Sequence, residues 1–374
     1  MPALIMLIPQ EIMADILTRL PAKSIGCCRC VSKSWRHLLS GHHFIKAHLN
    51  RTKEFMDNEL LMLISCYFNT LCRTNIAHHL SGEMTAFTTK LCFVVHSDFL
   101  TEGMPSCDGL ILIKNNRSKR QLVNPTTNEA RELPVLPYAL YPRASFTMYG
   151  LGYDHVNDDY KVVTLSYCDT DNQRGIDCTE MFVNVYSVRN GTWKPAESSP
   201  YDHSVGHVTS GVYASGFVHW IACNTTDYSS VIVGFDLTKE EFCKVAAPSS
   251  FDGQNFVFKS LMVFGGCLCI PSWSNDEIEI WVMKEYGVKE SWTKFSIVNP
   301  EALEFRPVLC MSGQREIVMV KDEDKEDEKL VMYNLDSATF KDITIHGGVD
   351  EFHIGGNFVE TLVSPYYNNA TQRG

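Results

Sequence analysis

Two cysteines and two histidines near the start of the chain are spaced so that they could bind a metal ion. Cys27 and Cys30 form a C-x-x-C pair, and His42 and His43 follow at a separation that superficially suits a zinc site. Both cysteines also fall on a predicted helix whose apolar face has to be filled, and thiols are good small hydrophobic groups. We therefore expect both thiols to pack in a core and predict no metal site.

Two other patterns contain only part of a functional motif. His203 and His207 have the spacing of a zincin pair, but Ser204 occupies the position of the required glutamate, so we expect histidines in a loop. Residues 150–152, Gly-Leu-Gly, lack the third glycine of a dinucleotide-binding turn, and no phosphate-binding loop or nucleophile elbow is recognisable. The sequence thus predicts no catalytic residue and no cofactor.

The acidic residues offer one enzymatic alternative, because glycosidases use paired carboxylates and some of them are β-propellers. Asp154, Asp158 and Asp159 precede a predicted strand in a polar segment where turn geometry alone favours aspartate. We expect them to form a turn and not to act in catalysis. A second acidic run, residues 321–329, is expected to be a solvated hairpin loop, with a direct role in target binding as the alternative.

The composition describes a globular protein without a membrane span. Of the 374 residues, 45% are hydrophobic, which is ample for one small module and one large domain. No apolar run approaches transmembrane length, and no secretory signal is recognisable before Pro9. Fourteen cysteines without regular spacing are then best explained as reduced thiols. We expect a protein of the cytoplasm, the nucleus or both, without membrane contact.

Charge is distributed unevenly along the chain. Residues 1–50 contain six Lys or Arg and two Asp or Glu, which gives +4, and the whole chain carries −11, so the remainder carries −15. A basic segment beside an acidic bulk indicates a segment that meets an acidic partner surface, although simple surface solvation gives the same pattern. The acidic bulk disfavours nucleic acid as a partner.

Helical periodicity with clear start and stop signals is confined to residues 8–49. Pro9 suits the first turn of a helix, and apolar residues then recur at three- and four-residue spacing until Pro21 ends this helix. A second helix is predicted over residues 23–31, and a third ends at Gly41. Three short helices bury too little surface to be stable alone, so we expect them to dock against a partner.

The residues of these helices resemble the F-box motif in its plant form. The match is carried at fixed spacing by residues 8–11, 16–17, 20–24, 29–36, 44 and 48–49. The resemblance implies an F-box over residues 4–50 that binds the Skp-type adaptor of a Skp-cullin-F-box ubiquitin ligase and, through it, cullin. The residues expected to contact the adaptor are Pro9, Ile12, Ile16, Leu20, Pro21, Val31 and Trp35.

From Pro105 onward a degenerate repeat predicts antiparallel strands. Each copy has an apolar or aromatic start, a small polar residue, a turn and a large or apolar closing residue, and the copies are residues 122–130, 185–193, 234–242, 332–340 and a longer fifth one around 281–292. Closing residues recur every 48 to 50 residues, the length of a four-stranded propeller blade. We predict a complete or incomplete β-propeller in which residues 358–363 pair with residues 60–64. Core positions are expected at Trp193, Trp281 and Trp292.

This second region resembles the F-box-associated domain of a large plant family. The match is carried by residues 106–111, 123–127, 150–154, 159–163, 185–193, 216–220 and 280–292. The two resemblances together imply an α+β multidomain protein. It has the F-box at 4–50, a linker and first strand region at 51–95, and an antiparallel, kelch-like β-propeller domain at 96–365.

In that family the second domain is understood to capture a protein target. The implied function is a non-catalytic substrate adaptor of a ubiquitin ligase, with an unknown protein target. The alternative is a β-propeller enzyme or ligand sensor with a helical dimerisation arm.

Target recognition is expected on loops, because the core of a propeller fixes its strands. The longest irregular connections are residues 137–149, 169–179, 197–208 and 272–277, and we expect some of them to emerge on opposite faces. The residues in them of types enriched at binding hot spots are Tyr138, Tyr141, Arg143 and Tyr201.

Overall fold

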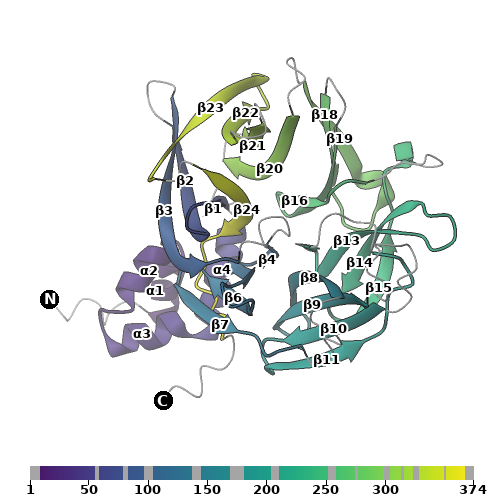
Figure 1. Cartoon of the computed structure of the whole chain (residues 1–374). Helices are drawn as coiled ribbons and strands as arrows, with labels where there is room; N and C mark the ends of the chain where they lie inside the picture. The colour runs from purple at the N-terminus through teal and green to yellow at the C-terminus, as the bar shows by residue number, and fades with distance from the viewer. Residues whose placement is uncertain are drawn as a thin grey trace.

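Four helices at the start of the chain are followed by strands arranged around a common centre (Figure 1). The computed structural model describes residues 9–54, 59–78, 83–96, 104–136, 145–168, 181–203, 210–251, 258–273, 277–298, 304–312, 316–322, 328–348 and 351–366. Among these residues, no helix is long and apolar enough to cross a membrane.

The helical module comprises the helices α1 (Gln10–Leu17), α2 (Ala22–Cys28), α3 (Lys33–Ser40) and α4 (His42–Glu54). Ser32 caps α3, because its hydroxyl accepts a hydrogen bond from the Trp35 backbone N–H at 3.1 Å. The predicted count of three helices is therefore too low, and α4 replaces the start of the expected polar link. The apolar pattern of α4 is interrupted in the sequence, because a polar residue, His48, occupies a core position and is only 2% exposed.

The described strands form one eight-stranded sheet and four four-stranded sheets. The eight-stranded sheet divides where β23 pairs in parallel with β3, so there are six antiparallel groups of four, which we number as blades 1 to 6. Blade 1 contains β24 (Phe352–Val359), β1 (Glu59–Ser65), β2 (Thr70–His78) and β3 (Met84–Val94). Blade 2 contains β4 (Ser106–Cys107), β5 (Leu110–Lys114), β6 (Arg120–Asn124) and β7 (Glu129–Glu132).

The remaining blades follow in chain order. Blade 3 contains β8 (Ser145–Asp154), β9 (Asp159–Cys168), β10 (Met181–Ser187) and β11 (Thr192–Ala196). Blade 4 contains β12 (Val212–Ala214), β13 (Phe217–Cys223), β14 (Ser230–Asp236) and β15 (Glu241–Val245). Blade 5 contains β16 (Met262–Phe264), β17 (Cys267–Trp273), β18 (Glu277–Met283) and β19 (Trp292–Val298). Blade 6 contains β20 (Glu304–Ser312), β21 (Glu316–Asp322), β22 (Glu328–Asn334) and β23 (Thr339–His346).

The C-terminal strand completes the first blade, but it is Phe352–Val359, so only Phe358 and Val359 of the predicted residues 358–363 pair with β1. β24 pairs with β1 in antiparallel fashion, and Phe358 lies opposite Leu60. Residues 51–95 thus supply the end of α4 and three strands of one blade. Segments from the two ends of the domain are thus joined by main-chain hydrogen bonds.

The predicted hairpins are present, and they share one turn chemistry. The third strand ends in a polar side chain whose oxygen accepts hydrogen bonds from backbone N–H groups two and three residues later, as at Asn124, Asp236 and Asn334. Four residues after each of these polar residues, and four residues after Ser187 in blade 3, the backbone φ is positive. These positions are Asn128, Glu240, Ala338 and Gly191. The small polar residue of the repeat is therefore required by the turn.

Two of the three predicted tryptophans are equivalent core residues. Trp292 is 8% exposed and its indole N–H donates to the carbonyl of Ala246, at the end of the preceding blade. Trp193 is half-buried and donates in the same way to the carbonyl of Pro134. Trp281 is not equivalent, because it lies on the third strand of its blade, β18, and not on the fourth.

The helical module packs against the propeller. Leu362, which follows β24, lies in one apolar cluster with Leu17, Ile25 and Phe44 of the module. Leu49 of α4 lies in the apolar cluster between blades 2 and 3. Part of the surface that three or four helices cannot bury alone is thus covered by the propeller of the same chain.

Candidate functional site

The seven residues predicted to contact an adaptor differ in exposure. Ile12 and Ile16 on α1 are 53% and 50% exposed, and Val31 after α2 is 65% exposed. Pro9 and Pro21 are also exposed. The other two, Leu20 and Trp35, are half-buried and pack against the core of the module. We call the exposed apolar residues Ile12, Ile16 and Val31 the docking patch.

The C-x-x-C pair lies on the surface of the same module. Cys27 and Cys30 are exposed, so the prediction that both thiols pack in a core is wrong. The helix turns Ile25 and Cys28 toward the core instead. Within the described ranges, no group of three or more His, Cys, Asp or Glu side chains could hold a metal ion.

Helix α4 fixes the module to the propeller by ion pairs with two turns. Lys53 Nζ lies 2.6 Å from Asp108 Oδ1 in the β4–β5 turn. Burial alone would lower the pKa of Lys53, but the neighbouring Asp108 carboxylate outweighs it and raises this pKa. In the β8–β9 turn, Asp158 meets Lys46 Nζ at 3.2 Å, His42 Nε2 at 3.2 Å and, from blade 3 itself, Arg189 Nη2 at 2.9 Å.

These contacts define two faces of the propeller. Within an antiparallel blade, the first-to-second and third-to-fourth turns emerge at one edge, and the other connections emerge at the opposite edge. Because α4 meets first-to-second turns in blades 2 and 3, we call that side the module face and the opposite side the loop face.

All four connections predicted to recognise a target start and end on the loop face. They join β7 to β8, β9 to β10, β11 to β12 and β17 to β18. Each of these connections follows the second or the fourth strand of a blade. The second and fourth strands of a blade run in the same direction, so they end on the same face. The prediction that some of these connections emerge on opposite faces is wrong for this reason.

Most of the individual target-binding residues lie outside the described residues. This applies to Tyr138, Tyr141 and Arg143, and also to His207. Tyr201 is half-buried and packs against the small apolar cluster of Ala222, Val231 and Val233. Large exposed aromatic side chains of the loop face are found instead in two second-to-third turns, at Tyr67 and Phe68 in blade 1 and Tyr228 in blade 4.

A cavity of about 590 Å³ lies at the centre of the propeller. Its wall includes the inner strands β4, β12, β16 and β24, and Thr52 and Lys53 of α4 line it at the module face. This volume is within the range of small-molecule sites. Sequence reasoning missed the cavity and the α4 contacts, since no local pattern relates residues of different blades.

The three aspartates considered for catalysis lie in the turn between β8 and β9 or at its two ends. Asp154 Oδ1 accepts hydrogen bonds from the backbone N–H groups of Val156 and Asn157, both at 3.1 Å. Asp159 accepts hydrogen bonds from Ser187 Oγ and from the Arg189 backbone N–H. The expected turn is therefore present, and each buried carboxylate is engaged by its own donors.

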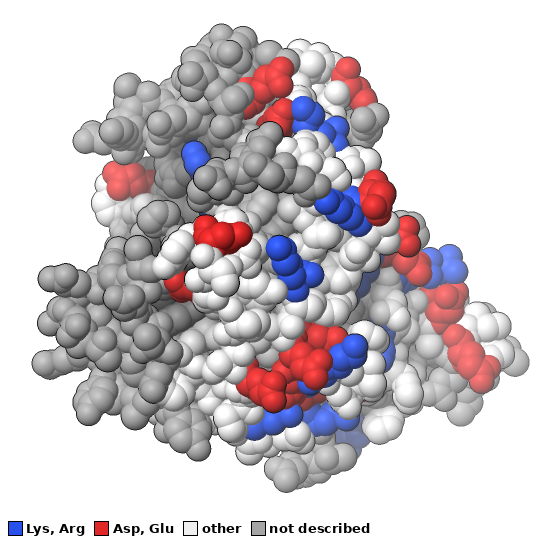
Figure 2. All heavy atoms as spheres, turned by 90° about the vertical axis from the view of Figure 1, so that its right-hand side faces the viewer, with Lys and Arg blue, Asp and Glu red and all other residues white. Residues whose placement is uncertain are grey.

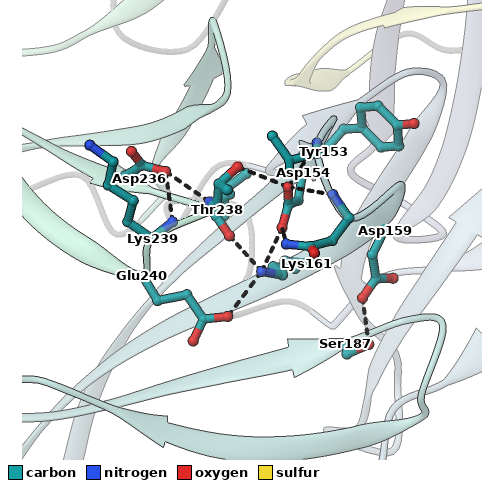
Figure 3. A network of polar contacts seen from close by, with 12 residues as sticks. Tyr153, Asp154, Asp159, Lys161, Ser187, Asp236, Thr238, Lys239 and Glu240 are labelled. Atoms are coloured by element: carbon teal, nitrogen blue, oxygen red, sulfur yellow. Dashed lines mark hydrogen bonds and ion pairs between the residues drawn. The ribbon is translucent and has the colours of Figure 1, made fainter.

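Asp154 also takes part in an ion-pair network that joins blades 3 and 4 (Figure 3). Lys161 Nζ lies 2.8 Å from Asp154 Oδ2 and 2.9 Å from Glu240 Oε1, and Thr238 Oγ1 donates to Asp154 at 2.9 Å. Burial would raise the pKa of Asp154, but hydrogen bonds from Lys161 and Asn157 hold it well below its usual range. Burial raises the pKa of Asp159.

Two buried histidines occupy the core of blade 4. His203 packs between Trp220 and Phe242, and His219 Nε2 lies 2.7 Å from the Tyr286 hydroxyl of blade 5. Burial lowers the pKa of both imidazoles to about 4. His203 lies in the connection between β11 and β12, as expected of a loop histidine, but its side chain is buried in the core.

The flank formed by blades 4 and 5 carries charged side chains of both signs among the residues that the structure describes. Lys and Arg side chains lie among Asp and Glu side chains over this surface (Figure 2). One such pair, Lys294 and Glu279, is in contact at 2.6 Å. A mixed surface of this kind is typical of solvated regions.

Comparison with known proteins agrees with this architecture. Residues 5–46 match the F-box domain, and residues 60–366 match the F-box associated beta propeller domain. The chain is 30% identical over 364 residues to F-box protein CPR1 of Arabidopsis thaliana, covering 90% of this chain and 84% of that protein. It is 26% identical over 368 residues to the F-box/kelch-repeat protein At3g23880 of the same plant, covering 96% of each chain. The chain therefore belongs to the family of F-box proteins that carry an F-box associated beta propeller domain.

Proposed function

We propose that this chain is a substrate-recognition adaptor of a Skp-cullin-F-box ubiquitin ligase. The observation that carries this proposal is the docking patch. Ile12, Ile16 and Val31 are each at least half exposed, while other apolar residues of the module are buried in its own core together with Leu362. A partner that covers these side chains gains about 25 cal/mol for each Å² of apolar surface removed from water. The F-box identity of the module supports a Skp-type adaptor as that partner, and cullin through it.

The chain itself acts without catalysis in this proposal. Its propeller holds a protein target near the ligase, and other subunits perform the transfer chemistry, so its contribution is proximity. The separation of module face and loop face supports this arrangement, because the loop connections start and end on the side away from α4. The eleven cysteines whose side chains the structure describes are free thiols, which supports a reducing location in the cytoplasm or nucleus.

The test is co-purification of the full chain with a Skp-type adaptor. Replacing both Ile12 and Ile16 by Asp should abolish capture, because loss of each buried anchor typically costs about 2 kcal/mol. These two side chains are preferable to Leu20 and Trp35, whose partial burial would mix a binding defect with a folding defect.

The matched control is Val135→Asp, which places the same charge at an aliphatic side chain that is 85% exposed and belongs to the propeller. This variant should capture the adaptor at wild-type yield. Wild-type yield from the Ile12→Asp, Ile16→Asp variant would reject the docking patch. Turnover on a glycan panel, without adaptor capture by the wild type, would favour a propeller enzyme.

A further inference from the structure

An aromatic turn on the loop face is exposed without a covering element. Tyr67 and Phe68, in the β1–β2 turn of blade 1, are 70% and 62% exposed. Neighbouring aromatic side chains of this exposure are unfavourable in water and are enriched where proteins bind partners. The turn lies across the propeller from the module, since β1 runs from the end of α4 toward the loop face.

A cation is placed beside this turn. Lys90 Nζ, on the exposed outer strand β3, lies 4.5 Å from the centre of the Phe68 ring. Such a cation–π contact holds the ammonium group at the aromatic surface, where its remaining hydrogen-bond donors face solvent. A ligand that meets Phe68 therefore also meets a positive charge.

Backbone contacts connect the aromatic turn to a basic turn of blade 2. The Val95 N–H donates to the Asn69 carbonyl at 2.7 Å, and Val95 forms a β-bridge with Asn115. Asn115 Oδ1 in turn accepts hydrogen bonds from the backbone N–H groups of Arg117 and Lys119, at 2.9 and 3.0 Å. The β5–β6 turn is thus fixed next to blade 1 with both long cationic side chains exposed.

The charge of this region contrasts with that of the chain. We call Tyr67, Phe68, Lys90, Arg117 and Lys119 the aromatic-basic rim. Two carboxylate residues are joined to it by contacts: Glu132 is ion-paired with Lys119, and the Glu351 carbonyl accepts the Cys66 N–H. The rim itself thus contains three cations and no carboxylate, in a protein whose net charge is −11.

We propose that the aromatic-basic rim binds an acidic segment of the target protein that carries a bulky apolar or aromatic side chain. The aromatic pair supplies stacking area, and the cations select negative charge and speed association. Nucleic acid, the other polyanion, is disfavoured by repulsion from the acidic remainder of the propeller. This inference rests on the proposed function, because it names the chemistry of the target that the adaptor captures.

The experiment measures binding of labelled peptides to the full chain in complex with its Skp-type adaptor. The probe is a short peptide that is rich in Asp and Glu and has a central pair of Phe residues. Three other ligands are compared with it: the same peptide with both Phe residues replaced by Ser, the same peptide with its Asp and Glu residues replaced by Lys, and single-stranded DNA. We expect binding of the first peptide only, with an affinity that falls as salt is raised.

Two variants separate the contributions of ring and charge. Phe68→Ser and the pair Lys90→Glu with Arg117→Glu should each weaken binding by about tenfold or more. Tyr228→Ser removes an equally exposed aromatic side chain from blade 4 of the same face and should change nothing. All these side chains are exposed, so the thermal midpoint is expected to stay at the wild-type value, which serves as the folding control.

The outcomes distinguish this inference from the proposed function. Equal binding of the acidic peptide to wild type and charge-reversed rim, no binding by the wild type, or equal binding of DNA would overturn the inference. In each case adaptor capture by the same samples still supports the adaptor role. Failure of the wild type to capture the adaptor would instead overturn the proposed function.

Discussion

At the scale of single residues, Lys161 is the cation that holds blades 3 and 4 together. Its partners Asp154 and Glu240 have side chains that are 0% and 14% exposed. Lys161→Met should lower the free energy of unfolding by about 3–5 kcal/mol, because it leaves the buried Asp154 carboxylate without a counter-charge. Chemical denaturation of the full chain measures this loss.

A matched control is available at the same network. Lys194 pairs with the other oxygen of Glu240 at 2.8 Å, but its side chain is 59% exposed. Lys194→Met should therefore cost less than about 1 kcal/mol. If the two substitutions have equal effects, Lys161 does not have the structural role assigned to it.

The buried histidines predict loss of stability in mild acid. Their folded-state pKa of about 4 lies below the unfolded value of 6.5, so between these values the unfolded chain binds protons that the native state does not. The stability that His203 and His219 contribute is therefore complete above pH 6.5 and is lost as pH falls toward 4. Each shift corresponds to about 3 kcal/mol.

The measurement is the free energy of unfolding as a function of pH. His219→Gln should reduce the slope between pH 6.5 and 4 by about one proton, because one of the two titrating groups is removed. His37→Gln, at an exposed histidine of α3, provides the control and should leave the slope unchanged. An unaltered slope in His219→Gln would show that this imidazole is charged in the native state.

At the scale of elements, the outer strands are joined by tryptophans that reach the preceding blade. Trp292→Ala should destabilise the protein by about 3–5 kcal/mol, because it removes a buried ring and leaves the Ala246 carbonyl without its donor. Trp193→Ala should cost less, since its ring is half-buried. Denaturant midpoints of the two variants test this order. A larger loss of stability for Trp193→Ala than for Trp292→Ala would contradict it.

The sequence predicts elements well where one local rule governs them. The polar residue at Asn124, Asp236 and Asn334 is needed by each turn, so the hairpins could be located from type and spacing alone. Helix α4 could not be located from its sequence, because buried His48 interrupts its apolar pattern. The sequence predicts that Cys27 and Cys30 fill the apolar face of a helix, whereas the rotation of α2 places Cys28 there.

The candidate sites, too, could be predicted from the sequence only where a local pattern governs them. The exposed apolar residues Ile12 and Ile16 could be named from one helical period. The common face of the loop connections depends on strand direction in different blades, and the ion pairs of α4 join residues more than fifty positions apart, as Lys53 and Asp108 do. Such relations arise only when the blades are assembled, so sequence spacing does not report them.

At the scale of the whole molecule, the ion pairs of α4 determine how the docking patch is oriented relative to the loop face. Asp158 is central to them, because it meets two side chains of α4 and Arg189 of blade 3. Its backbone φ of 53° is tolerated by asparagine, so Asp158→Asn removes the charge without straining the turn. Losing this partly exposed network should lower the opening free energy of α4 by about 1 kcal/mol.

Hydrogen exchange on the full chain measures this change directly. Amides of α4 should exchange about fivefold faster in Asp158→Asn, while those of β13, in a blade that α4 does not pair with, keep the wild-type rate. Capture of the Skp-type adaptor should be unchanged, because the docking patch lies on α1 and at the end of α2. Glu290→Gln, at an exposed carboxylate of blade 5, controls for the loss of one negative charge. Faster exchange of α4 in both variants would mean that net charge, and not the contact with Asp158, holds the module in place.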